Sequence, residues 1–70
     1  MIIFEKQLDN MYFDSKDDLD VTVEKDGKLN FTYHEPKHHY NKDGVTTIFK
    51  LSQDDAIKLA FSILHHYVEL

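Results

Sequence analysis

Histidines are the residues of this chain whose type and spacing come closest to a chemical site. His34, His38 and His39 fall within one short segment, and imidazole nitrogens are common ligands for zinc and nickel. On a strand, His34 and His38 would share a face while His39 pointed away, so a three-histidine site requires a loop. His65 and His66 are helical neighbours about 100° apart, which keeps them from binding one ion together. We expect polar turn residues and no bound metal, and we keep a histidine-based metal site as an alternative.

Four aspartates form a second cluster, at Asp14, Asp17, Asp18 and Asp20. Their spacing lacks the glycine and the final glutamate of an EF-hand loop, so calcium binding is not predicted. Such a cluster can steer the chain towards a basic patch on another protein. It can also imitate a phosphate backbone, or simply keep a small protein soluble. We favour solubility and keep a DNA-mimicking inhibitor as an alternative.

Nucleophilic catalysis has little support in this sequence. The serines are Ser15, Ser52 and Ser62, none of them within a G-x-S-x-G turn, and the chain has no cysteine. Glycine occurs only at Gly27 and Gly44, which excludes a glycine-rich phosphate loop. We therefore expect a non-enzymatic protein without a cofactor.

The charge balance argues against direct nucleic-acid binding. The chain has 13 acidic residues and 8 basic ones, all lysine, for a net charge of −5. Without arginine it lacks the forked donor that most phosphate and base contacts use, and its net charge repels a polyanion. The first residues resemble no signal peptide, and no apolar run approaches a membrane span. A cytoplasmic protein without membrane contact is the expectation.

Two turns organise the elements that must position these residues. A three-residue loop from Lys25 to Gly27, with glycine in a left-handed bulge, pairs Val23 with Leu29. It also places the pairs Val21–Phe31 and Leu19–Tyr33 on one apolar face. A second Asp-Gly turn at 43–44 precedes a strand from Val45 to Leu51, with Ile48 on the opposite face. Pro36 bends or ends the preceding strand, and residues 35–42 are either strand or loop.

The remaining segments complete an α+β domain. Apolar residues near the N-terminus predict one bulged strand or two short ones, and residues 15–18 are expected to form a connection. Residues 52–70 predict a helix that begins at a Ser52–Asp55 capping box. Its apolar arc covers about 200° of the circumference, about twice an ordinary stripe. Residues 1–70 are thus expected to be a single domain, an antiparallel β-meander of three to four strands with the C-terminal helix packed on one face.

The wide apolar arc leads to the functional expectation. A domain this small has little core in which to bury it, so a second surface should cover it. We expect a protein–protein interaction module that forms a homo-oligomer, most simply a dimer. It would act by occupying a partner surface, as an inhibitor or accessory protein of the kind that phages and mobile elements carry. The residues expected at the contacts are Asp14, Asp17, Asp18, Asp20, Tyr12, Ile48, Leu59 and Phe61.

Overall fold

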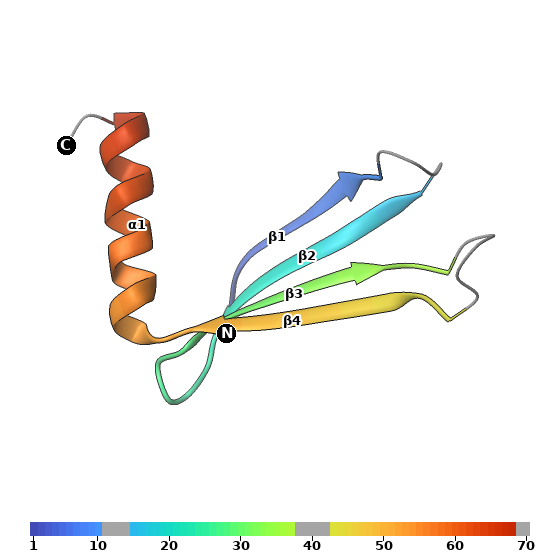
Figure 1. The fold of residues 1–70 in the computed structure, drawn as a ribbon, viewed down its shortest axis with the longest axis horizontal. Coiled ribbons are helices and arrows are strands. Elements are labelled where there is room, and N and C mark those ends of the chain that lie inside the picture. The colour runs from blue at the N-terminus through green and yellow to red at the C-terminus, as the bar shows by residue number, and fades with distance from the viewer. Residues whose placement is uncertain (11–14, 38–42, 69–70) are drawn as a thin grey trace.

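Four antiparallel strands and one helix make up the chain in a computed structural model that describes residues 1–10, 15–37 and 43–68. The strands are β1 (Ile2–Asp9), β2 (Lys16–Val23), β3 (Leu29–Glu35) and β4 (Val45–Leu51), followed by α1 (Gln53–Val68). They hydrogen-bond in chain order, β1-β2-β3-β4, as a meander (Figure 1). The predicted α+β class, with a C-terminal helix after an antiparallel meander, is confirmed.

The hairpin between β2 and β3 has the predicted register. Val23 pairs with Leu29, Val21 with Phe31 and Leu19 with Tyr33. Gly27 has a φ of +88°, the left-handed conformation that the bulged loop requires of glycine. Alternation along the strands therefore gathers apolar side chains on one side of the sheet, which we call the inner face.

β3 and β4 extend this inner face. Phe31 pairs with Phe49, and their rings stack with centroids 4.7 Å apart. Ile48 pairs with Thr32 on the opposite, outer face, as the alternation predicts. β3 ends at Glu35, immediately before Pro36, because proline cannot donate to the ladder. Residues 38–42, which the sequence left open as strand or loop, lie outside the described residues.

β1 is an edge strand with a register shift between Ile2 and Phe4. Beyond that shift, Phe4 lies opposite Val21 and Lys6 opposite Leu19. The expected connection at residues 15–18 is shorter than predicted. β2 already begins at Lys16, because residues 16–18 pair with the far end of β1 and gain its backbone hydrogen bonds.

α1 leaves the end of β4 steeply and stands to one side of the sheet rather than lying along it (Figure 1). A single residue, Ser52, joins the two elements. The contact between α1 and the strands is small and lies mainly with β4. The radius of gyration is 14.7 Å, whereas a compact chain of this length has about 11 Å. The chain is therefore unusually open for its size.

Very little of the described chain is buried. Val21, at 8% exposure, is the one buried apolar residue among residues 1–10, 15–37 and 43–68. No helix in these ranges combines the length and the apolar character needed to cross a bilayer. The core consists of a thin patch at the centre of the inner face.

Candidate interaction surface

Capping at Ser52 fixes where α1 begins. The Asp55 backbone N–H donates to Ser52 Oγ at 3.2 Å, and the Ala56 N–H donates to the Ser52 carbonyl at 2.9 Å. These bonds satisfy amides that the first turn would otherwise leave without partners. Asp54 and Asp55 in the first turn and His65 and His66 in the last turn complement the helix dipole when the histidines are charged. The predicted start of the helix is confirmed.

The apolar side chains of α1 remain exposed. No helical residue from Gln53 to Val68 is buried. Leu59, predicted as a contact residue, is 40% exposed, and Phe61 is 64% exposed. A monomeric protein rarely leaves a continuous patch of this kind uncovered, and such patches mark interaction sites.

These apolar residues form one continuous arc along α1, which we divide into two stripes. At 100° per residue, one group centres on Ala56 and the other lies about 110° further around the helix. We call the first group the inner stripe; it contains Ala56, Leu59, Ala60, Ile63 and Tyr67. We call the second group the outer stripe; it contains Ile57, Phe61, Leu64 and Val68.

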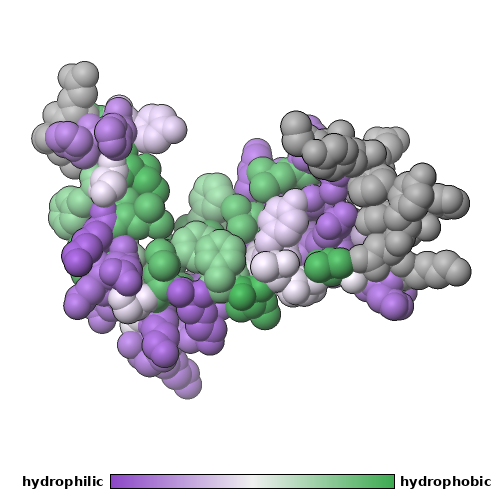
Figure 2. All heavy atoms as spheres, viewed as in Figure 1, coloured by the Kyte–Doolittle hydropathy of each residue, from purple (hydrophilic) through white to green (hydrophobic). Residues whose placement is uncertain are grey.

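The inner stripe faces the inner side of the sheet across an open groove. One section of the groove, of about 330 Å³, lies between the start of α1 and the ends of β1 to β3. A second section, of about 200 Å³, has Ala56, Leu59, Ala60 and Ile63 along one wall. Its other wall consists of Val21, Leu29 and Phe31. Hydrophobic residues therefore lie on both sides of the space between helix and sheet (Figure 2).

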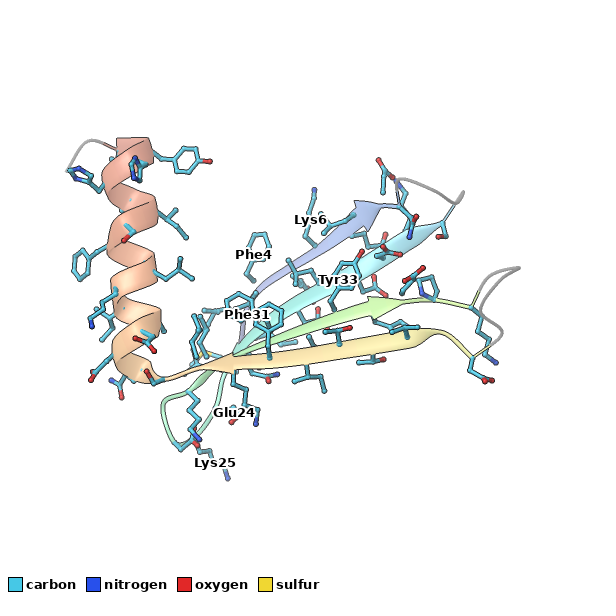
Figure 3. All side chains as sticks on the ribbon, viewed as in Figure 1. Phe4, Lys6, Glu24, Lys25, Phe31 and Tyr33 are labelled. Atoms are coloured by element: carbon cyan, nitrogen blue, oxygen red, sulfur yellow. The ribbon has the colours of Figure 1, made fainter. Side chains whose placement is uncertain are left out.

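The inner face of the sheet continues beyond the groove, where the helix does not reach. Phe4 and Phe49 are both about half exposed, at 53% and 52%. Phe4, Phe31 and Tyr33 extend from the same side of the sheet, together with Lys6 of the edge strand (Figure 3). The helix and the sheet thus each carry apolar surface that the other leaves uncovered.

The aspartate cluster does not form one surface. Asp17 is only 1% exposed, so the expected role of its carboxylate in steering a partner is not available to it. Alternation explains the difference, because Asp17 shares the inner face with Leu19, whereas Asp18 and Asp20 lie on the outer face. Asp18 and Asp20 are partly exposed, and Gln7 Nε2 donates to Asp18 Oδ1 at 3.2 Å. Asp14 and Tyr12 lie outside the described residues.

Asp17 belongs instead to a polar cluster that was not predicted. The Tyr33 hydroxyl donates to Asp17 Oδ2, and Asn10 Nδ2 contacts the same carboxylate at 3.2 Å and 3.4 Å. The hydrogen bond to Asp17 raises the pKa of Tyr33, and partial burial of the phenol adds to the shift. The sequence carried a signal for this cluster, because Leu19 pairs with Tyr33 and alternation places Asp17 on the same face as Leu19. The cluster anchors the end of the sheet remote from α1.

The histidines of the described chain do not converge. His34 Nδ1 lies 2.8 Å from the Thr46 hydroxyl on the neighbouring strand, and His65 and His66 meet edge to face. No group of three potential ligands occurs within residues 1–10, 15–37 and 43–68. His38 and His39 lie outside those ranges, so the alternative of a three-histidine metal site stays a prediction.

Ile48 completes the set of predicted contact residues. Its side chain is 58% exposed on the outer face, on the opposite side of the sheet from the groove. The structure therefore brings Leu59 to the groove, leaves Phe61 on the outer stripe, and separates both from Ile48, Asp18 and Asp20. No family model matches the chain, and neither the curated proteins nor the solved structures include a match to it.

Proposed function

We propose that this chain is a small, non-enzymatic protein–protein interaction module that acts by occupying the surface of a partner. α1 is its main contact element, and an inhibitor or accessory role in the cytoplasm fits such a module. The observation that carries the proposal is the exposure of α1, whose apolar side chains are 40% to 86% exposed from Ile57 to Val68. Covering such a surface is a principal driving force of protein association.

The character of this surface favours an apolar contact over an electrostatic one. The outer and inner stripes contain no charged residue. The acidic residues described on the outer face lie on the other side of the sheet, and Asp17 is withdrawn from solvent. Steering by Asp18 and Asp20 would raise the rate of encounter, while burial of apolar side chains would hold the complex together.

Affinity capture with matched variants tests this function. The immobilised wild-type chain, Leu64→Gln and Lys58→Gln are each exposed to a lysate of the native host at low and high salt. We expect a protein retained by the wild type and by Lys58→Gln but lost from Leu64→Gln. The substitutions suit a comparison because glutamine is a good helix former and both positions lie on α1.

The salt dependence of retention distinguishes an apolar contact from an acidic mimic. Retention that persists at high salt supports an apolar contact, since screening weakens contacts between exposed charges. Retention that is lost at high salt and is equal for the wild type and Leu64→Gln would overturn the proposal in favour of an acidic mimic. Absence of any difference between Leu64→Gln and Lys58→Gln would overturn it as well.

A further inference from the structure

Apart from Ile57, the outer stripe of α1 faces no surface of its own chain within residues 1–10, 15–37 and 43–68 that could cover it. The inner stripe already points at the sheet, and the outer stripe lies about 110° further around the helix. Complete closure of α1 onto its own sheet would bury the inner stripe together with Ile57, which already lines the groove, and would leave the rest of the outer stripe uncovered. Phe61 and Val68 are 64% and 57% exposed, and such a closure would leave them so.

Two apolar stripes at this separation suit a helix that contacts a sheet and, beside it, another helix. A helix packed on a sheet offers the sheet one side, and a neighbouring helix in the same layer contacts it at roughly a right angle to that side. α1 is the only helix of the described chain. The second helix must therefore come from another molecule.

The exposed area is large enough for a stable interface. The accessible surface is 5946 Å², whereas a compact monomer of 8.3 kDa exposes about 4,600 Å². The excess of about 1,400 Å² exceeds the roughly 800 Å² that each partner buries in a standard interface. The chain as a whole thus has enough surplus surface for a contact between copies.

The charges at the two ends of α1 suit a second copy lying antiparallel. Asp54 and Asp55 occupy the first turn, and His65 and His66 occupy the last. In an antiparallel pair, the acidic turn of one helix lies beside the histidines of the other, and the two helix dipoles oppose each other favourably. In a two-fold symmetric dimer, each acidic turn lies beside the histidines of the other helix, so this favourable contact occurs twice.

Pairing between sheet edges is the competing way to join two copies, and β1 is built against it. Lys6 carries its charge on the inner face of this edge strand, and the register shift near Ile2 distorts the end of the strand. Inward-pointing charges and bulges are known devices that prevent edge-to-edge association. The β1 edge is therefore a poorer contact than the helix.

We propose that two copies of this chain form a two-fold symmetric dimer, in which the α1 helices pack antiparallel along their outer stripes. The inner stripes remain facing the inner faces of the sheets across the groove. This inference rests on the proposed function, because it identifies the partner of the same helix as a second copy of the chain.

An equal mixture of ¹³C-labelled and unlabelled chains tests the dimer by isotope-filtered NMR. We expect intermolecular contacts between outer-stripe side chains, chiefly Phe61, Leu64 and Val68, of differently labelled chains. Leu64→Gln should weaken self-association about tenfold or more, as expected for loss of a central apolar contact. Lys58→Gln, the matched control outside both stripes, should leave the dissociation constant unchanged.

Several results would overturn the dimer. A chain that remains a monomer at the highest concentration, with no intermolecular contacts, would do so. Intermolecular contacts restricted to β1 or β4 would replace the helix pair with edge pairing. If Leu64→Gln fails to fold, the filtered spectra of the wild type still decide the question. A monomer that nevertheless captures a partner through Leu64 would refute the dimer and leave the proposed function intact.

Discussion

Val21 is the residue whose truncation should reveal where the core of a single chain lies. Val21→Ala removes two methyl groups from a side chain that is 8% exposed, between the strands that carry Phe4 and Phe31. At about 0.8 kcal/mol for each buried carbon group, transfer alone costs about 1.5 kcal/mol, and the cavity raises the total to about 2 kcal/mol. The melting temperature should fall by roughly 10 °C.

Val45→Ala is the matched control for this substitution. Val45 also lies on the inner face, but it is 43% exposed, so its truncation should cost about half as much. Both substitutions replace valine by alanine within a strand, so the loss of intrinsic strand propensity is the same in both and cancels in the comparison. Urea unfolding followed by far-UV circular dichroism measures both free energies of unfolding. An equal or smaller effect for Val21→Ala would refute our placement of the core.

Three further outcomes follow from individual residues and from the charge. Gly27→Val should lower the melting temperature more than Gly27→Asn, because φ is +88° and asparagine tolerates this left-handed conformation better than a branched residue does; equal melting temperatures would count against the bulged loop. The hydrogen bond to Asp17 raises the pKa of Tyr33. The free energy that this bond contributes to folding is therefore fully present below the pKa of an unfolded tyrosine, near 10, and is lost as pH rises through the pKa of Tyr33 in the folded chain. Alkaline unfolding curves of Tyr33→Phe should lack this loss, and a curve parallel to the wild type would argue against the bond. The net charge falls from −5 at pH 7 to zero at the isoelectric point near 5.3, so light scattering should increase between these pH values, and a flat signal would contradict this expectation.

Local patterns were sufficient to predict the hairpin and the start of the helix. The register of β2 and β3 follows from one condition, that Val21, Phe31 and their neighbours share a face, and only a three-residue loop meets it. The Ser52 cap is likewise a short-range signal, because the hydroxyl reaches an amide three residues away. Both features depend on residues close together in the sequence.

The candidate site was harder to predict because it depends on distant elements. Asp17 was grouped with Asp18 and Asp20 by proximity, although alternation sends it to the other face, where Tyr33 binds it. The angle at which α1 leaves β4 has no local signature, so the sequence could not show that the groove stays open. The width of the apolar arc did indicate surplus surface, and Leu59 and Phe61 are accordingly exposed in the single chain.

The surplus apolar surface of α1 can be tested most directly by sedimentation equilibrium at several protein concentrations. We expect a mass that approaches twice the 8.3 kDa of the chain as concentration rises, and a return towards 8.3 kDa for Leu64→Gln. A wild-type mass of 8.3 kDa at every concentration would contradict the account, because the outer stripe would then need no second copy to cover it.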